Sequence, residues 1–160
     1  MSLTIMRRIK FCAGHRLYKH GGKCENFHGH NYVADFFLSG ESQDSVGRVV
    51  DFATVKAKCK GWLDQHWDHS FLVFEDDKNA IAALSQVQPC RMFLLPYNPT
   101  AENMAKYLLE VASPSLFAEG EGKVVRVRIW ETDESYAEAA LSQDCETVLS
   151  SVSTSSFDDI

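Results

Sequence analysis

The sequence predicts an α+β domain in which two helices cover one face of a four-stranded, mostly antiparallel sheet. Its hydrophobic pattern gives the order strand, strand, helix, short strand, helix, strand. Pairs of strands separated by amphipathic helices are typical of this fold class. The chain has 160 residues, of which 45% are hydrophobic and 24% are charged. This size and composition suit one globular domain with a core of its own.

The first two strands are expected over residues 4–15 and 28–38, joined by a polar, glycine-containing loop. Side-chain alternation places one set of residues of the first strand on a common face: Ile5, Ile9, Phe11, Ala13 and His15. The matching face of the second strand carries His28, His30, Tyr32, Ala34 and Phe36. If the two strands pair as an antiparallel hairpin, His15 comes near His28 and His30.

Two helices are expected where a capping residue precedes apolar residues at helical spacing. Asp51 is a good N-cap for a helix that runs to about His66. Thr100 is the N-cap of a second helix, which ends near residue 113. Between these helices lie an apolar run over 71–74, a stretch in which residues 81–84 fit one helical turn, and a short strand over 91–95.

The last predicted strand covers residues 123–132, and one face of it carries Val125, Val127, Ile129 and Glu131. A carboxylate on a buried face is costly without a partner. Glu131 therefore either marks the point where the strand leaves the core or accepts two parallel N–H bonds from a planar ligand. We expect the domain to span residues 4–141 and a polar extension to follow over 142–160.

Charge and composition disfavour several classes of function. The net charge is −6 and no basic block is present, which argues against nucleic acid as the main partner. No apolar run approaches the roughly 20 residues that span a bilayer, and the N-terminus lacks the apolar core of a signal peptide. Five scattered cysteines favour a reducing, cytoplasmic location. An open sheet has two edges, which favours a homo-oligomer.

The segment from Cys24 to Tyr32 carries the strongest chemical signal. Two histidines separated by one glycine point to the same side of a strand, and neutral imidazoles suit zinc. We expect His15, His28 and His30 to bind zinc and to leave one coordination position open. Cys24 is either a fourth ligand that closes a structural site or a free thiol activated by a neighbouring cation.

Asp68 and His69 form an adjacent acid–imidazole pair directly after the first predicted helix. The pair is either a simple surface turn or a proton shuttle. The second interpretation requires His69 to reach Cys24, with Asp68 orienting the imidazole.

Six motifs, in this order, resemble the family of 6-pyruvoyltetrahydropterin and 6-carboxytetrahydropterin synthases. They are Phe11-Cys-Ala-Gly-His15-Arg, Cys24-x-x-x-His28-Gly-His30-Asn-Tyr32, Val50-Asp51-Phe52, Asp68-His69-x-x-Leu72, Asn98-Pro99-Thr100-Ala-Glu102-Asn103 and Trp130-Glu131-Thr132. The resemblance covers about residues 4–141. It implies the tunnelling fold, in which subunits join their sheets into a barrel, typically as a hexamer of two trimers.

The resemblance also implies roles for the candidate residues. It implies zinc on the three histidines, Cys24 as the proton-abstracting thiolate, and Asp68 with His69 as its relay. It further implies Glu131 as the anchor of the pterin and Thr100 as a residue near it.

The spacing of three residues between Cys24 and His28 resembles the 6-carboxytetrahydropterin branch, which serves queuosine biosynthesis. The implied reaction converts 7,8-dihydroneopterin triphosphate to 6-carboxy-5,6,7,8-tetrahydropterin and releases triphosphate and acetaldehyde. Two alternatives stay open: a 6-pyruvoyltetrahydropterin synthase and a non-catalytic Cys-His₃ zinc-binding module. The chain departs from the family pattern at Val73, where Asn is frequent, and in a longer stretch between Phe74 and Pro99.

Overall fold

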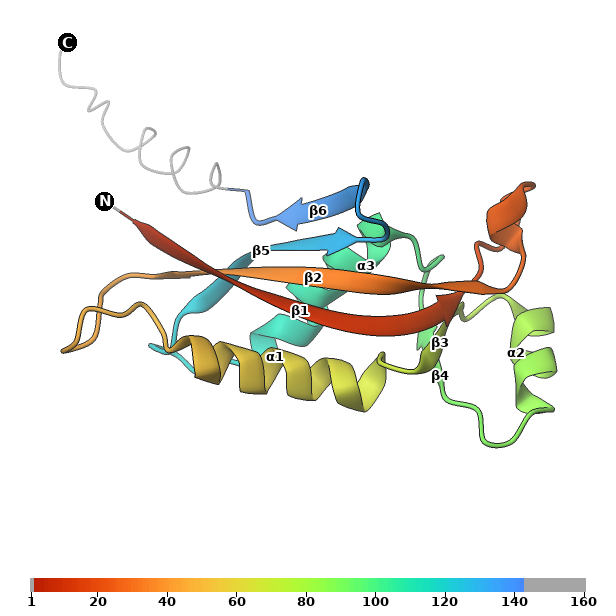
Figure 1. Cartoon of the computed structure of the whole chain (residues 1–160), viewed down its shortest axis with the longest axis horizontal. Coiled ribbons are helices and arrows are strands. Elements are labelled where there is room, and N and C mark those ends of the chain that lie inside the picture. The colour runs from red at the N-terminus through yellow and green to blue at the C-terminus, as the bar shows by residue number, and fades with distance from the viewer. Residues whose placement is uncertain (1, 143–160) are drawn as a thin grey trace, which may run out of the picture.

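A computed structural model describes residues 2–142 and contains a curled six-stranded sheet with helices against one face (Figure 1). The strand order is β4-β3-β1-β2-β5-β6. The strands are β1 (Leu3–His15), β2 (His28–Gly40), β3 (Ser70–Phe74), β4 (Met92–Leu95), β5 (Lys123–Trp130) and β6 (Tyr136–Ala140). The helices are α1 (Phe52–His66), α2 (Lys78–Ser85) and α3 (Ala101–Tyr107), with short helical segments η1 (Lys23–Glu25), η2 (Leu108–Ala112) and η3 (Ser113–Ser115).

The α+β class is confirmed, but the count of four mostly antiparallel strands and two helices is wrong. β3 pairs in parallel with β1, and β4 pairs in parallel with β3. β6 adds an antiparallel strand beyond β5, and α2 is a third helix. β3 has only five residues and no clean alternation, while β6 is mostly exposed and has no buried apolar face. Neither strand therefore gives the periodic signal on which the sequence prediction depends.

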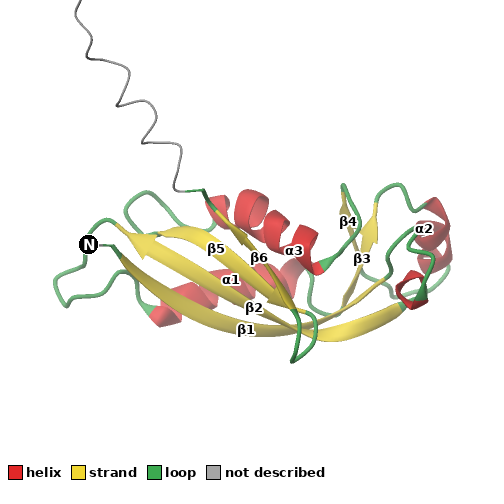
Figure 2. Cartoon of the chain, turned by 90° about the horizontal axis from the view of Figure 1, so that it is seen from above, coloured by secondary structure: helices red, strands yellow, loops and turns green. Residues whose placement is uncertain are grey.

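The long hairpin of β1 and β2 is confirmed, and its register determines where the histidines lie. His15 pairs with His28, and Ala13 pairs with His30. Side chains that are directly opposite in an antiparallel pair lie on the same face of the sheet. That face packs against α1 and α3, which lie together behind β1, β2 and β5 (Figure 2). The buried members from the two strands are Ile9, Phe11, Ala13, His15, Tyr32, Ala34, Phe36 and Leu38.

Both predicted N-caps are confirmed. The Asp51 carboxylate accepts a hydrogen bond from Ala53 N at 2.7 Å at the start of α1. The Thr100 hydroxyl accepts one from Asn103 N at 3.2 Å at the start of α3. The buried residues of these helices complete the core with Val55, Cys59, Leu63, Met104 and Ala105.

One face of β5 differs from the prediction. The register with β2 shifts between Phe37 and Leu38, so that Arg126 pairs with Phe37 and Val124 pairs with Leu38. Val125 is the extra residue of this bulge, and the alternation reverses there. The buried apolar residues of β5 are accordingly Val124, Val127 and Ile129.

An ion pair joins the stretch between β3 and β4 to Arg16, the residue that follows β1. The Arg16 guanidinium donates two hydrogen bonds of 2.6 Å to the carboxylate of Asp77, which is 1% exposed. The same carboxylate caps α2 through Ala80 N. This pairing ties α2 to the end of the strand that carries His15. Among residues 2–142, no helix is long and apolar enough to cross a membrane.

Candidate metal and active site

Three imidazoles meet at the end of the β1–β2 hairpin, as the sequence predicts. The ring centroid of His15 lies 4.5 Å from that of His28 and 5.1 Å from that of His30. The Nε2 atoms of His15 and His28 are 3.1 Å apart. Within the described residues, these three histidines form a group that could hold a metal ion, and Cys24 is not part of it.

Backbone carbonyls fix the orientation of two of these rings. The Nδ1 atom of His15 lies 2.8 Å from the carbonyl oxygen of Pro99, and that of His28 lies 2.7 Å from the carbonyl oxygen of Asn26. A carbonyl oxygen only accepts hydrogen bonds, so each Nδ1 carries the ring proton. The two Nε2 atoms therefore face one another on the side of each ring away from its carbonyl partner, which is the orientation that ligating histidines need.

The electrostatics of the group also suit a cation. Burial lowers the pKa of His15 to about 4 and lowers the pKa of His30, so both rings are neutral at pH 7. The buried Nε2 atom of His30 has no hydrogen-bond partner and lies 3.4 Å from Glu131 Oε1. Lone pairs 3.1 Å apart repel each other unless a positive charge lies between them. Three converging imidazoles beside one carboxylate fit a zinc ion with an open position.

Tyr32 is buried beside the three histidines and contacts His15, which the sequence analysis did not predict. Its hydroxyl lies 3.2 Å from Nδ1 of His15. Burial, followed by the nearby Glu131 and Cys24, raises the pKa of Tyr32 far above its usual value, so the hydroxyl stays protonated. The same strand alternation that placed His28 and His30 on this face extends to Tyr32, but only the fold shows its contact with His15.

Cys24 lies in η1, in the loop that joins β1 to β2. Its side chain is half-buried, and its carbonyl oxygen accepts a hydrogen bond from Leu17 N at 2.8 Å. The thiol is unpaired, as are those of Cys12, Cys59 and Cys90.

Asp68 and His69 lie between α1 and β3, where they contact Cys12. The Asp68 carboxylate accepts hydrogen bonds from Cys12 N at 2.9 Å and from His69 Nδ1 at 2.8 Å. His69 Nε2 is 3.6 Å from Cys12 Sγ. Within the described part of one chain, His69 contacts Cys12 rather than Cys24, so a relay to Cys24 stays a prediction. The parallel β1–β3 pairing, which the sequence did not predict, brings Cys12 to this position.

Glu131 and Thr100 line one pocket of about 310 Å³, together with Leu17, Ala101, Glu102, Ser135, Tyr136 and Ala137. Glu131 follows the end of β5, and its backbone N–H donates to Ser135 O at 3.1 Å. The carboxylate thus leaves the core at the strand end and still faces the histidine group through His30. The interpretation that the strand leaves the core at Glu131 therefore holds, while the contact of its carboxylate with a planar ligand stays a prediction.

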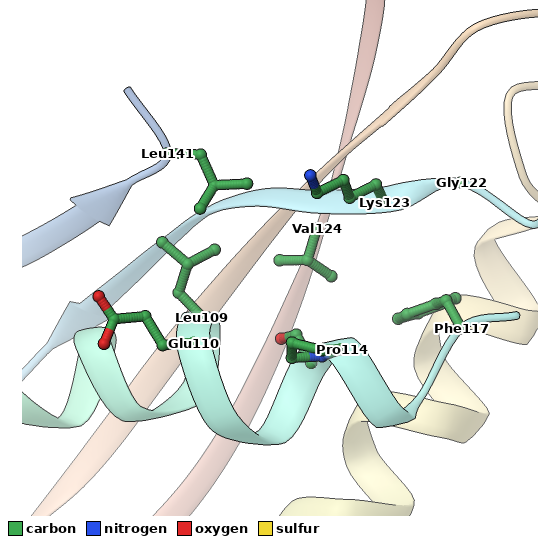
Figure 3. Close-up of a pocket in the computed structure, with 9 residues that line it drawn as sticks. Leu109, Glu110, Pro114, Phe117, Gly122, Lys123, Val124 and Leu141 are labelled. Carbon is green, nitrogen blue, oxygen red and sulfur yellow. The ribbon is translucent and has the colours of Figure 1, made fainter. Parts of the chain in front are cut away.

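Two further hollows differ in their relation to these residues. A surface depression of about 480 Å³ is lined by residues that include His28, His30, Cys12 and His69. A cavity of about 430 Å³ lies between β5 and the helical segments η2 and η3 (Figure 3). Among the described residues, none of the predicted site residues lines that second cavity. The chemistry of the site therefore belongs to the sheet end that carries the histidines.

A curled, helix-backed sheet with three converging imidazoles and an adjacent acidic pocket defines an α+β protein with a group that could hold a metal ion. Comparison with known proteins specifies this class further. A model of the family 6-pyruvoyl tetrahydropterin synthase matches residues 4–141. The chain belongs to this family.

Curated relatives and solved structures agree with this membership. The 6-carboxy-5,6,7,8-tetrahydropterin synthase of Rickettsia bellii is 36% identical over 132 residues, covering 82% of this chain and 96% of the relative. The enzyme of that name from Aquifex aeolicus is 30% identical, covering 86% and 98%. The Caenorhabditis elegans 6-pyruvoyl tetrahydropterin synthase superimposes with a TM-score of 0.63 at 27% identity, covering 89% and 97%.

Proposed function

We propose that this protein is a zinc-dependent 6-carboxy-5,6,7,8-tetrahydropterin synthase of the queuosine pathway. Its substrate would be 7,8-dihydroneopterin triphosphate, and its products the carboxylated pterin, triphosphate and acetaldehyde. The observation that carries this proposal is the convergence of the Nε2 atoms of two carbonyl-anchored histidines beside the pocket of Glu131 and Thr100. The curated relatives of the same name support the carboxy product.

His15, His28 and His30 would hold the metal. A bound zinc ion supplies Lewis-acid chemistry that lowers the pKa of a coordinated hydroxyl group. Burial keeps the pKa of His15 near 4, so this ligand does not compete for protons at neutral pH. The Pro99 and Asn26 carbonyls hold the rings of His15 and His28 in the ligating orientation.

Cys24 would be the general base, and Asp68 with His69 would relay the proton. A thiolate at Cys24 takes a proton from the side-chain carbon next to the pterin ring, and His69 accepts it onward. Partial burial opposes ionisation of Asp68, but hydrogen bonds from Cys12 N–H and His69 keep its pKa below the usual value. An ionised Asp68 orients Nδ1–H of His69 and leaves Nε2 free to accept a proton.

Glu131 would anchor the pterin. Its carboxylate lies at the border between the 310 Å³ pocket and the histidine group. A carboxylate that accepts two parallel N–H bonds fixes a planar ring in one orientation. The 2-amino edge of a pteridine offers such a donor pair. Thr100 lies on the same pocket at the start of α3.

Oligomerisation would complete the site. Within the described residues, β4 and β6 form the two edges of the sheet, and open edges are suited to pairing with another copy. We propose a hexamer of two trimers in the cytoplasm, in which the sheets close into a barrel. In such an assembly, Asp68 and His69 of one subunit would serve Cys24 of another.

Product analysis tests the proposal. The purified, zinc-loaded protein is incubated with 7,8-dihydroneopterin triphosphate, and the products are identified by mass spectrometry. We expect 6-carboxy-5,6,7,8-tetrahydropterin and one equivalent of acetaldehyde. Formation of 6-pyruvoyltetrahydropterin without acetaldehyde would assign the pyruvoyl activity instead. No turnover by a protein that retains zinc would favour the non-catalytic zinc-binding module.

A further inference from the structure

We propose that Cys12, Asp68 and His69 form a second metal site, which takes a thiolate-binding divalent cation such as zinc. The three residues offer one sulfur, one oxygen and one nitrogen, and their ligand atoms all lie within 4.8 Å of one another. This donor set suits zinc because zinc accepts thiolate, carboxylate and imidazole ligands.

The distances match the edges of a zinc coordination tetrahedron. Cys12 Sγ lies 3.6 Å from His69 Nε2 and 3.7 Å from Asp68 Oδ1. Zinc–sulfur and zinc–nitrogen bonds of about 2.3 and 2.1 Å at a tetrahedral angle place sulfur and nitrogen about 3.6 Å apart. The sulfur atom therefore already lies at the required distance from the oxygen and the nitrogen, and only the direction of the His69 ring must change.

The backbone holds this arrangement together. His69 N donates to Cys12 O at 2.8 Å, while Cys12 N donates to the Asp68 carboxylate at 2.9 Å. His69 has a positive φ of 56°, an uncommon conformation for a residue other than glycine. The parallel pairing of Ala13 with Ser70 fixes β3 directly beside Cys12. Three segments of main chain thus bring the sulfur and the acid–imidazole pair together.

One local change is needed for coordination. Cys12 Sγ is nearly equidistant from the two ring nitrogens of His69, at 3.7 Å from Nδ1 and 3.6 Å from Nε2. The ring must turn so that Nε2 points toward the ion. The side chain of His69 is 76% exposed, so solvent leaves room for this rotation. The carboxylate of Asp68 is ionised and can coordinate through Oδ1.

The second site shares no ligand with the three-histidine group, although residues of both groups border the depression of about 480 Å³. Cys12 pairs with Asn31, whereas Ala13 and His15 pair with His30 and His28. Because strand side chains alternate faces, Cys12 points away from the face that carries the histidines. The two groups share no residue, and only the second contains a thiol.

This site would regulate the protein by inhibition, a consequence that rests on the proposed relay. An ion on Nε2 of His69 occupies the lone pair that would accept a proton. Excess zinc should then stop turnover without displacing the ion held by the histidines. The site would therefore respond to free metal, in contrast to a permanent cofactor site.

Cobalt titration tests the binding itself, whether or not the protein turns over pterin. The metal-free, full-length protein is titrated with Co²⁺, and its absorption and bound metal are measured. We expect a second equivalent of ion and a thiolate-to-cobalt charge-transfer band. Cys12→Ala should lose the charge-transfer band and bind only the ion of the histidine group. His28→Ala should lose that ion but keep the band and the ion bound by Cys12. Cys24→Ala is the matched thiol control and should keep the band.

Several outcomes would overturn the inference. They are a single bound ion in the wild type, two ions in Cys12→Ala, or a band that disappears with Cys24→Ala instead. Cys12→Ser removes the sulfur ligand but keeps the size of the side chain. If its circular dichroism spectrum matches that of the wild type, loss of the ion reflects the missing ligand and not a loss of the fold. In an active preparation, Cys12→Ala should need at least about tenfold more zinc for half-inhibition. Equal inhibition of both proteins would refute the regulatory role.

Discussion

The three-histidine group and the group of Cys12, Asp68 and His69 differ in how firmly the protein orients their side chains before an ion binds. His15 is 1% exposed, and its ring is anchored on the Pro99 carbonyl. His69 is 76% exposed, and its ring is oriented by the neighbouring Asp68. A ligand that is buried and anchored to main chain loses little freedom when an ion binds. An exposed ligand can turn away and serve a second purpose.

The comparison shows how one strand can supply two chemistries. Alternation along β1 directs His15 toward the helices and Cys12 toward the other face. On the helix side, burial lowers the pKa of His15 to about 4, so that this ring is neutral and suited to a resident ion. On the other side, a thiol, a carboxylate and an imidazole stay close to solvent. This difference agrees with our proposals of a resident metal for the first group and of a proton relay with metal-sensitive control for the second.

The largest expected effect is the loss of turnover when Cys24, the proposed general base, is removed. Cys24→Ala should lower turnover by about 10²- to 10⁴-fold, because general-base catalysis contributes that much. Zinc content should stay at the wild-type value, since the metal group does not include Cys24. Steady-state kinetics and metal analysis of the same preparation measure both quantities. Wild-type turnover in this variant would remove Cys24 from the mechanism.

Acid should destabilise the metal-free protein through the buried histidine. The folded-state pKa of His15 is about 4, below the ordinary value of 6.5, so the unfolded chain takes up the proton first. This contribution is complete above about pH 6.5 and falls by about 3 kcal/mol as the pH drops toward 4. Carboxylates such as Asp68, whose folded pKa is lowered, lose their contribution only at still lower pH.

Urea unfolding at several pH values between 7 and 4 measures this loss. His15→Asn is the control because it removes the titrating group and keeps a polar side chain. The free energy of unfolding of this variant should depend less steeply on pH over that interval. An equal slope in both proteins would show that another group is responsible.

A smaller effect is expected from a substitution that separates β1 from β2 next to the histidine group. A Cβ atom on Gly29, between His28 and His30, would lie 2.8 Å from the backbone oxygen of Ala13. The strands must separate locally, so Gly29→Ala should destabilise by about 1–3 kcal/mol and weaken zinc binding. Gly61→Ala in α1 is the matched control, since a Cβ there meets nothing within 4 Å. It should stabilise the protein by about 0.5–1 kcal/mol. Thermal unfolding and zinc titration of both variants would check these expectations.

The sequence predicts the elements that have strong periodicity and the residues that alternation brings together. β1, β2, β4, α1 and α3 agree with their patterns, β5 agrees except at the Val125 bulge, and the hairpin register brings His15 to His28 and His30. β3 and β6 were missed because β3 is a short run without alternation and β6 is mostly exposed. Their pairing depends on tertiary contacts.

The parts of the site that the sequence could not give are contacts between distant segments. The Pro99 carbonyl reaches His15 across 84 positions, and Asp68 reaches Cys12 across 56. No local pattern encodes such contacts. The polar extension predicted for 142–160 lies almost wholly outside the described residues.

The central claim is that His15, His28 and His30 hold the resident zinc ion while Cys24 does not. Its most direct test is the zinc content per chain in a Cys12→Ala background, so that only the histidine group can bind. We expect one zinc in this background and one after Cys24→Ala is added. Adding His28→Ala should abolish bound zinc while circular dichroism still reports a folded sheet. Full zinc in the His28→Ala protein, or loss of zinc with Cys24→Ala, would contradict the account.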